Sequence, residues 1–343
     1  MHKVGIDIGR SMVKATCNGE EVVEFPPLLA PVPPGGPVGL MDGRAERMEV
    51  LWEGARWMLG EGVRGSWGAR WVTDERKIGT DTLALGLGAL GRLGVQGEVT
   101  VCVGVPAALW GTDGHALRRL LSGPFVYSWN GHLRSATVAA YVLPEPAGTY
   151  FAWLLTPAGR ISDPAQARYP VAVVDVGYRS VDIVLVEGGE LKPYVTRSTA
   201  HGVVTAFDRL YARLTAEVGL LSDDERMDAF LAVVRGEPLV LKGRAFGDEF
   251  RRIVENARAD LAEAVIGDCR SALSGANYRV VLWTGGGAAW LRPELERAFP
   301  GGQWVPEPRL ANVRGFYRFA LWASTRQRPQ ARAAGPEADS AAG

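Results

Sequence analysis

Two copies of one short hairpin pattern constrain this 343-residue chain more than any other feature. The clearer copy, VAVVDVGYRSVDIVLVE, spans residues 171–187 and reads as an apolar strand, a turn and a second apolar strand. A weaker copy, KVGIDIGRSMVKATCNG, stands at the N-terminus. Two such hairpins predict two related halves that close on one ligand. Each copy has an aspartate at a strand end, then a glycine and a charged residue: Asp7, Gly9 and Lys14, and Asp175, Gly177 and Asp182.

The composition excludes several classes of protein. A hydrophobic content of 47% over 343 residues is enough for two domains with real cores. Lys plus Arg and Asp plus Glu both number 38, so bulk charge favours neither direct nucleic-acid binding nor membrane binding. We find no signal segment and no apolar run long enough to span a bilayer, and we expect a cytoplasmic protein.

Cysteine and histidine give no sign of a metal cluster. The three cysteines are odd in number and far apart, which predicts neither a disulfide framework nor a metal site and agrees with a reducing compartment. The histidines lack metal-ligand spacing, so we interpret them as ordinary polar residues. These residues are Cys17, Cys102, Cys269, His2, His115, His132 and His201.

The first half is expected to open with antiparallel strands over residues 4–8, 13–16 and 21–25, because Asn18-Gly19 is a strong hairpin turn. Residues 26–43 are so rich in Pro and Gly that we expect a surface loop leading into an inserted subdomain. Residues 49–77 suit a small sheet whose tryptophans form a core or partner surface rather than a base-stacking platform. Those tryptophans are Trp52, Trp57, Trp67 and Trp71.

A helix over residues 80–93 would follow, capped by Thr80 or Asp81. The second half then repeats the order of the first, with the hairpin at 171–187, a third strand over 191–197 and a helix over 202–217. The tail from residue 325 has nothing apolar to bury, and we expect it to be disordered. The other expected strands are 98–105, 125–129, 132–143, 278–283 and 303–305, and the other helices are 113–121, 222–235, 247–274, 290–299 and 311–323.

The hairpin turns carry groups that suit a phosphate and a magnesium ion. Consecutive backbone N–H groups of a tight turn at Gly9 or Gly177 attract phosphate oxygens. Ser11, Lys14, Arg179 and Ser180 add donors for the same anion. The carboxylates of Asp7 and Asp175 repel phosphate, so they require an intervening Mg²⁺ or its waters.

A third glycine motif strengthens this interpretation. One isolated hairpin would be a surface β-turn with a turn-favouring Asp and Gly. TGGGA at residues 284–288 follows a strand and precedes a helix, and its backbone can be approached closely because Gly has no Cβ. That motif alone suits a strand-to-helix turn equally well. The two hairpins and the motif together favour a ligand site.

These elements, in this order, resemble the actin, heat-shock chaperone ATPase and sugar kinase superfamily. DIGRSMVK (7–14) looks like its first phosphate motif, DVGYRSVD (175–182) like its second, and TGGGA like its adenosine motif. The likeness is closest to the ParM and StbA type of plasmid-segregation actins and to archaeal actin-like proteins, and spans residues 3–324. Further matches are WMLGE (57–61), VGVPAAL (103–109), PEPAG (144–148) and ANVRGFYRF (311–319).

The resemblance implies an α/β, actin-like (ribonuclease H-like) duplicated fold, with two domains around a nucleotide cleft and a subdomain inserted in each. Domain I would span residues 1–148, with an inserted subdomain over about 36–95, and be completed by the helix 311–324. Domain II would span residues 149–310, with a helical insertion over about 207–275, and residues 325–343 would be a disordered tail.

The resemblance also implies roles for named residues. Glu145 would orient the attacking water, although a solvent-exposed loop glutamate between prolines is an alternative. Asp7 and Asp175 would act in catalysis and hold Mg²⁺ through water, and Lys14 would neutralise charge between the β- and γ-phosphates. The nucleotide contacts would be Gly9, Arg10, Ser11, Met12, Lys14, Gly177, Tyr178, Arg179, Ser180, Thr284, Gly285, Gly286 and Gly287.

Some positions leave alternatives open or depart from the family. Asp182 either belongs to the site or caps backbone N–H groups of its own hairpin, and Arg10 contacts a phosphate or solvent. Tyr178 stands where many relatives have a second Gly, and Ser180 stands near the usual Thr. Hydrolysis rate and nucleotide preference therefore do not transfer from the family, and ATP and GTP both stay candidates.

The function implied is that of an actin-like NTPase. It would polymerise into dynamic filaments with ATP or GTP and Mg²⁺, hydrolyse the nucleotide and segregate plasmid DNA. Its partners would be further copies of itself and an adaptor DNA-binding protein that links the filament to the plasmid centromere, without direct contact to nucleic acid or membrane. The alternatives are a nucleotide-binding regulatory or scaffold member of the superfamily and a small-molecule kinase.

Overall fold

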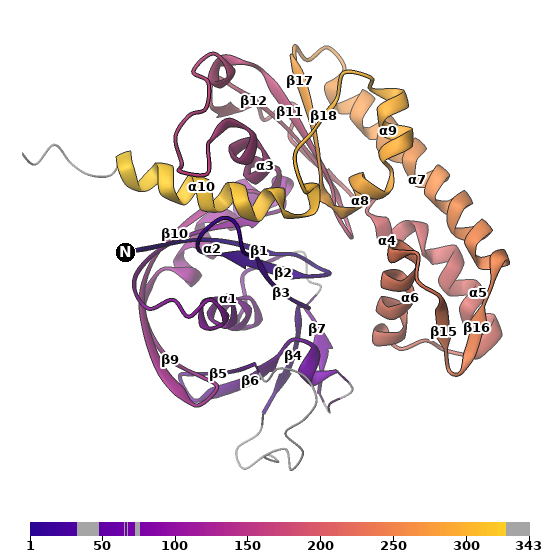
Figure 1. Ribbon diagram of the computed structural model, residues 1–343, viewed down its shortest axis with the longest axis horizontal. Helices are drawn as coiled ribbons and strands as arrows, with labels where there is room; N and C mark the ends of the chain where they lie inside the picture. The colour runs from indigo at the N-terminus through magenta and orange to yellow at the C-terminus, as the bar shows by residue number, and fades with distance from the viewer. Residues whose placement is uncertain (33–47, 65, 67, 73–75, 327–343) are drawn as a thin grey trace, which may run out of the picture.

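The computed structural model describes residues 1–32, 48–64, 66, 68–72 and 76–326, which form two sheets with helices between and around them (Figure 1). Within these residues, no helix combines the length and apolar character that a membrane span requires. In spatial order, the first sheet of the described residues contains β3 (Val23–Phe25), β2 (Val13–Thr16), β1 (His2–Ile8), β8 (Gly97–Val105), β10 (His132–Pro144), β9 (Gly123–Trp129), β5 (Glu49–Trp52), β6 (Ala55–Leu59), β4 (Leu28–Pro31) and β7 (Arg70–Trp71).

The second sheet is smaller, and a separate hairpin lies beyond it. In spatial order the second sheet contains β13 (Glu190–Leu191), β12 (Val181–Glu187), β11 (Val171–Val176), β17 (Val280–Thr284) and β18 (Gln303–Trp304), and β14 (Arg197–Thr199) also pairs with β12. The separate hairpin consists of β15 (Leu239–Leu241) and β16 (Arg244–Phe246).

The helices cover both sheets. The α-helices are α1 (Thr80–Arg92), α2 (Trp110–Leu121), α3 (Glu145–Leu154), α4 (Val203–Ala206), α5 (Asp208–Val218), α6 (Asp223–Arg235), α7 (Asp248–Leu273), α8 (Gly285–Trp290), α9 (Arg292–Ala298) and α10 (Ala311–Arg326). The short 3₁₀-helices are η1 (Glu61–Val63), η2 (Ala107–Leu109), η3 (Gln166–Arg168) and η4 (Pro308–Leu310).

The two sheets share one core arrangement. In the first, β1, β8 and β10 are parallel and the hairpin partner β2 is antiparallel to β1. In the second, β11, β17 and β18 are parallel and β12 is antiparallel to β11. Strand β11 and residues 99–105 of β8 are buried on both faces, as largely apolar, valine-rich runs predict. The chain thus contains two related halves.

Helices α3 and α10 lie between the two halves and join them (Figure 1). Tyr150 of α3 packs against the valines of the second sheet, and Phe316 of α10 packs against Cys102 of the first. The two helices cross at glycines, where a Cβ on Gly315 would lie 1.6 Å from the carbonyl oxygen of Gly148. The interface between the halves therefore depends on the absence of side chains at this crossing.

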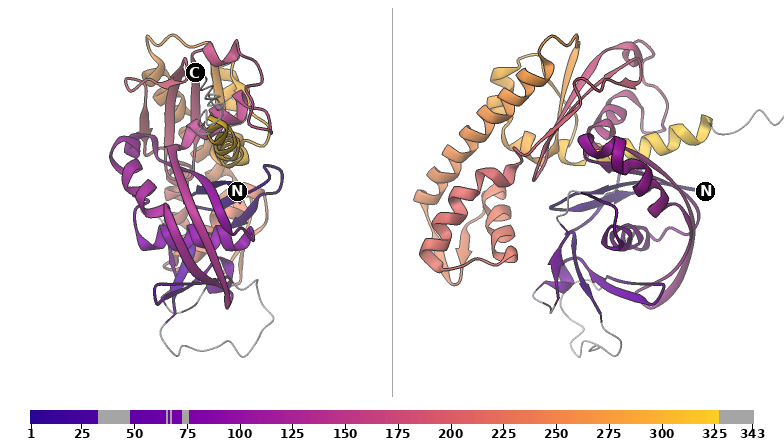
Figure 2. Two further views of the ribbon diagram at one scale, coloured as in Figure 1. Left: turned by 90° about the vertical axis from the view of Figure 1, so that its left-hand side faces the viewer. Right: turned by 180° about the vertical axis from the view of Figure 1, so that it is seen from behind.

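The first sheet curls around α1, which fills its concave side (Figures 1 and 2). The predicted helix begins at Thr80, but its first turn has no side-chain cap, because Gly79 is the N-cap and Asp81 forms an ion pair with Arg70 instead. The expected caps at Thr80 and Asp81 are therefore wrong. Trp57 is buried in this core, as expected for a small sheet, and Trp67 lies outside the described residues.

The expected loop over residues 26–43 is wrong at its start. Residues 28–31 form β4, whose Leu28, Leu29 and Ala30 are buried and which pairs with β6 and β7. The prolines stand beside or at the end of this short strand, where a missing N–H breaks no essential ladder bond. Residues 33–47 lie outside the described part of the chain.

Other differences are local. The expected strand over 191–197 is two short strands, β13 and β14, and the expected helix over 202–217 is divided into α4 and α5 at Phe207. Phe207 is buried in the core, where its packing decides the local backbone direction. The helical insertion also contains the β15–β16 hairpin, which the sequence did not predict. The tail begins after Arg326, outside the described residues.

Candidate functional site

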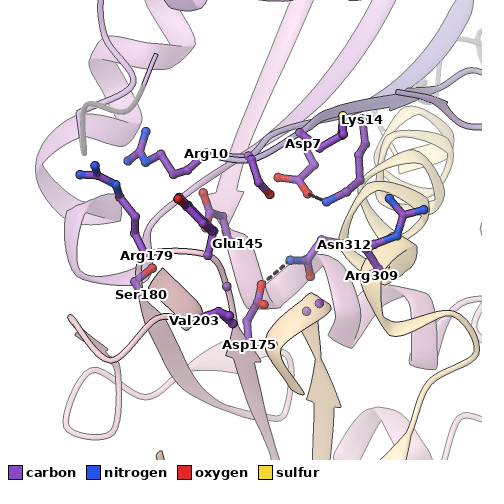
Figure 3. Close-up of a pocket in the computed structure, with 18 of the residues that line it drawn as sticks. Asp7, Arg10, Lys14, Glu145, Asp175, Arg179, Ser180, Val203, Arg309 and Asn312 are labelled. Carbon is purple, nitrogen blue, oxygen red and sulfur yellow. Dashed lines mark hydrogen bonds and ion pairs between the residues drawn. The ribbon is translucent and has the colours of Figure 1, made fainter. Parts of the chain in front are cut away.

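A cavity of about 640 Å³ lies between the two halves, a volume that suits a ligand of drug size or larger. It is bounded by the turns after β1 and β11 and by the first residues of α3, α8 and α10 (Figure 3). The repeated hairpins thus face one another across a shared space. The predicted site residues that line it are Asp7, Gly9, Arg10, Ser11, Met12, Lys14, Glu145, Asp175, Gly177, Tyr178, Arg179, Ser180, Gly285, Gly286 and Gly287.

The first hairpin supplies a carboxylate and a cation from neighbouring strands. Asp7 lies directly opposite Lys14 in the β1–β2 register, and the Lys14 Nζ is 3.1 Å from the Asp7 Oδ2. The Gly9 N–H donates to the Met12 carbonyl oxygen at 3.1 Å and closes the turn. The N–H of Gly9 therefore serves the hairpin and not an anion, which corrects the expected contribution of this glycine.

The second hairpin repeats this geometry with a different charge pattern. The Gly177 N–H donates to the Ser180 carbonyl oxygen at 2.8 Å, so it too closes its own turn. The loop is supported from behind by α4, because the N–H of Val203 donates to the Gly177 carbonyl oxygen and the N–H of Val204 donates to the Tyr178 carbonyl oxygen. These bonds fix the part of the turn that lines the cavity.

Two carboxylates lie opposite one another in this second hairpin. Asp175 pairs with Asp182 in the β11–β12 register, at the position where the first hairpin has a lysine. Burial, the charge of Glu145 and the charge of Asp182 together raise the pKa of Asp175 to about 8. The Asn312 Nδ2 donates to the Asp175 Oδ2 at 2.6 Å, which opposes part of this rise. The neighbouring charges that raise the pKa of Asp175 are thus those of other carboxylates.

Asp182 bonds a backbone N–H group of the first half of the chain, and not the backbone N–H groups of its own hairpin that the sequence suggested. Its carboxylate accepts hydrogen bonds from the Ala107 N–H at 2.9 Å, from the Ser180 hydroxyl at 2.7 Å and from the Ser198 hydroxyl. Burial and then the charge of Glu145 raise its pKa to about 6. Since Ala107 belongs to the first half, Asp182 connects the two halves; within its own hairpin it bonds the Ser180 hydroxyl, and it does not line the cavity.

Glu145 is the first residue of α3, directly after β10, and its side chain is 17% exposed. It forms an ion pair with the buried Lys77. The alternative of a solvent-exposed loop glutamate is therefore wrong. The side chain lies against β8 at Gly104, where a Cβ would come within 2.9 Å of the Glu145 Cγ.

Two glycines of the TGGGA segment pack so closely against neighbouring residues that no side chain would fit at their positions. Gly285 has a φ of 89°, and a Cβ there would lie 2.3 Å from the Asp175 Oδ1. Gly287 is equally close to Val203, whereas a Cβ on Gly286 would meet only open space. Thr284 is buried beneath the cavity, where its hydroxyl donates to the Pro308 carbonyl oxygen. All three glycines line the cavity, and a side chain would not fit at Gly285 or Gly287, whereas Thr284 does not line the cavity.

The cavity also contains residues that the sequence did not indicate. Phe230 and Trp290 form an apolar wall beside the predicted Tyr178, whose ring packs edge-on against Phe230 at 4.7 Å between ring centroids. At another edge, Arg309 forms a bidentate ion pair with Glu24. Glu24, Phe230, Trp290 and Arg309 stand outside the predicted motifs, and each reaches the cavity through the tertiary fold. Further unpredicted lining residues are Phe25, Pro26, Lys77, Pro106, Val203, Leu231, Pro308 and Asn312.

Asp7 and Asp175 fit a Mg²⁺ ion. Both are mostly buried carboxylates that face the same cavity, and hard oxygen donors are the ligands that Mg²⁺ prefers. Burial is the main cause of the raised pKa of Asp175, and the charges of Glu145, Asp182 and Asp7 add to it; a divalent cation would offset this second cause. No group of three acidic, His or Cys side chains forms a direct metal cage among the described residues. Mg²⁺ commonly takes one or two carboxylates and completes its shell with water and phosphate oxygens.

Two family models match the chain in sequence. Residues 5–148 match the model of the N-terminal domain of actin-like proteins, and residues 173–297 match the model of the C-terminal part of the archaeal MreB-like actin homologues. Both models describe actin-like proteins, and together they cover most of the chain. No curated protein sequence matches the chain.

Solved structures show the same fold. The archaeal actin homolog Ta0583 superimposes with a TM-score of 0.76 at 19% identity, over 95% of this chain and 100% of that one. ParM from a Clostridium botulinum filament gives a TM-score of 0.71 at 17% identity, over 93% and 98% of the two chains. Bacillus thuringiensis ParM with ATP gives 0.68 at 16% identity, over 95% and 99%. The predicted actin-like two-domain fold and the predicted likeness to ParM and archaeal actins are confirmed.

Proposed function

We propose that this actin-like protein is a nucleoside triphosphatase that binds ATP or GTP with Mg²⁺ in the cavity and hydrolyses it. The observation that carries the proposal is the convergence of both Asp-x-Gly hairpins and Glu145 on one cavity. Solved neighbours support it, since Ta0583 has been crystallised in complex with ADP and Bacillus thuringiensis ParM with ATP. In this proposal, domain I comprises residues 1–148 and α10, and domain II comprises residues 149–310.

The residues would divide the reaction as follows. The turns at residues 10–12 and 178–180 would surround the phosphates, with Lys14 beside the β- and γ-phosphates. Glu145 would orient a water molecule whose oxygen forms a bond to the γ-phosphorus and whose proton Glu145 accepts. The bond from the γ-phosphorus to the bridging oxygen breaks, and the nucleoside diphosphate keeps that oxygen. Mg²⁺ held by Asp7 and Asp175 would neutralise charge on the phosphate oxygens.

The nucleoside would occupy the other end of the cavity. Gly286 leaves open space there, and Tyr178, Phe230 and Trp290 provide an apolar wall for a base. An aromatic wall contacts every purine through its π face, which supports both ATP and GTP as substrates. We therefore keep the two nucleotides as equal candidates.

We further propose that nucleotide binding drives assembly into filaments that separate plasmid DNA in the cytoplasm. A heterologous contact that repeats without closing yields an open helical filament. The Clostridium botulinum neighbour is described as a ParM filament, which supports this assembly. An adaptor protein would bridge the filament and the centromere, since the balanced 38 basic and 38 acidic residues support indirect contact with DNA.

The test combines right-angle light scattering with phosphate release. Addition of ATP or GTP with Mg²⁺ is expected to raise scattering, which then falls as phosphate is released. Glu145→Gln is expected to keep the rise and to slow phosphate release by about 100-fold or more, because general-base catalysis contributes about 10² to 10⁴. Glu190→Gln, which changes an 81% exposed side chain, is the control and should behave as wild type.

Two results would contradict the proposal. Absence of both scattering and phosphate release at micromolar protein would refute the polymerising NTPase. Phosphate transfer to a small acceptor without assembly would identify a kinase instead.

A further inference from the structure

A buried lysine reaches the cavity from the segment that precedes α1. The side chain of Lys77 is 2% exposed, and Lys77 lines the cavity together with Asp7, Glu145 and Asp175. Its Nζ forms an ion pair with Glu145, and among the described residues Glu145 is its hydrogen-bond partner. An ammonium group has three donors, so this contact leaves Lys77 with capacity for a further acceptor in the cavity.

The neighbours of Lys77 hold it in place. The Arg76 guanidinium donates to both carboxylate oxygens of Asp113 in α2, at 2.9 and 3.0 Å, and Asp113 is almost fully buried. That guanidinium holds the pKa of Asp113 below its usual range. On the other side, Ile78 packs against the core of the first half. Lys77 is therefore fixed by its neighbours, unlike a surface lysine that samples many rotamers.

The ion pairs in the cavity place Lys77 beside Glu145. Lys14 pairs with Asp7, and Lys77 pairs with Glu145, so two lysines from separate elements each contact one carboxylate of the cavity. Burial of an ammonium is unfavourable unless it is paired, and a structural pair of this kind is commonly neutral for stability. The carboxylate of this pair is nevertheless Glu145, the residue to which we assign orientation of the attacking water.

We propose that Lys77 is a second phosphate-site lysine, which bridges Glu145 and an oxygen of the terminal phosphate. This inference rests on the proposed function. A water oriented by Glu145 must lie about 3 to 3.5 Å from the γ-phosphorus, so a cation in contact with Glu145 lies near the γ-phosphate oxygens. A diphosphate lacks these oxygens. Lys77 thus couples the position of Glu145 to the presence of a triphosphate and distinguishes substrate from product.

The test compares triphosphate and diphosphate binding in Lys77→Gln. Affinity for ATP is expected to fall about tenfold, as for loss of a hydrogen bond to a charged group, whereas affinity for ADP should change less than about twofold. Turnover is expected to fall about 100-fold. Lys77→Arg should restore part of the preference for ATP. Lys192→Gln is the control, since Lys192 also contacts carboxylates but lies outside the residues that line the cavity.

A second variant separates a phosphate contact from a purely structural pair. Lys77→Gln alone leaves Glu145 with an unpaired charge, so Lys77→Gln/Glu145→Gln is measured beside Glu145→Gln. The double variant should lose the preference for ATP over ADP, and Glu145→Gln should retain it. If the pair were structural only, the double variant would recover both its melting temperature and its preference for ATP, which would overturn the inference.

The outcomes distinguish this inference from the proposed function. A wild-type protein that binds neither ATP nor GTP would refute the function itself. A wild-type protein that turns over ATP, with Lys77→Gln unchanged in turnover and in the ratio of ATP to ADP affinity, would refute only the role of Lys77. Equal weakening of ATP and ADP binding would refute it as well.

Discussion

Asp175→Asn should make the nucleotide-free protein more stable at alkaline pH while it removes the proposed metal ligand. Asp175 is buried opposite Asp182, and its pKa is raised from 3.8 to about 8. The amide of an asparagine has the shape of a protonated carboxyl group, and its oxygen can still accept the hydrogen bond from the Asn312 Nδ2. The variant therefore imitates the neutral form of Asp175 at every pH.

The magnitude follows from linkage. Between about pH 4 and pH 8 the unfolded chain has lost the Asp175 proton and the native protein retains it, so the free energy of unfolding falls as pH rises. The slope is at most about 1.36 kcal/mol per pH unit, and it vanishes above about pH 8. A rise of about 4 pKa units gives an upper limit of about 6 kcal/mol. Water in the cavity stabilises the ionised form, so we expect several kcal/mol.

The assay is urea denaturation of the nucleotide-free proteins in EDTA, from about pH 5 to about pH 9. The stability gained by Asp175→Asn should be smallest at the acidic end and largest above about pH 8. Asp248→Asn, which changes an 87% exposed side chain, should show no pH-dependent gain. A gain that is the same at every pH, or a variant that is less stable than wild type at about pH 8, would refute the reasoning.

Other changes test the interface and the closure of the cleft. Gly315→Ala places a Cβ 1.6 Å from the Gly148 carbonyl oxygen and should lower stability by about 3 kcal/mol or more in urea denaturation. Gly111→Ala in α2 meets open space and should instead raise stability, by up to about 1 kcal/mol; loss of stability there would contradict the packing argument. Trp71→Phe removes the indole N–H bond to Asp224 at 2.8 Å, a contact between the halves. Release of a fluorescent ATP analogue in stopped flow should accelerate about 2- to 10-fold, and an unchanged rate would show that this contact does not hold the cleft closed.

Local patterns in the sequence predicted the parts of the fold that are local in space. Alternation of apolar strands and turns located both hairpins, and the spacing of seven residues set the cross-strand pairs of Asp7 with Lys14 and of Asp175 with Asp182. The duplication of the hairpin predicted two halves. Composition misled at residues 28–31, where prolines flank a short apolar run, because burial against β6 outweighs a low local propensity for strand.

The remaining parts of the site depend on contacts across the fold. Lys77 stands in a charged segment with no motif, and its approach to Glu145 depends on the ion pair between Arg76 and Asp113 of α2. Asn312 lies within a segment that resembles the family, but its hydrogen bonds to Asp175 and Thr149 depend on how α10 crosses α3. Periodicity and turn chemistry give no information on such crossings.

The central claim is that a nucleoside triphosphate binds in the cavity between the two halves. Calorimetric titration of the wild type and of Gly286→Trp with ATP or GTP and Mg²⁺ tests it most directly, because a Cβ at Gly286 meets only open space and Gly286 lines the cavity, where an indole would compete with the nucleotide for space. Both proteins should fold, the wild type should bind one nucleotide per chain, and Gly286→Trp should bind none. Equal binding by the two proteins, or no binding by the wild type, would contradict the claim.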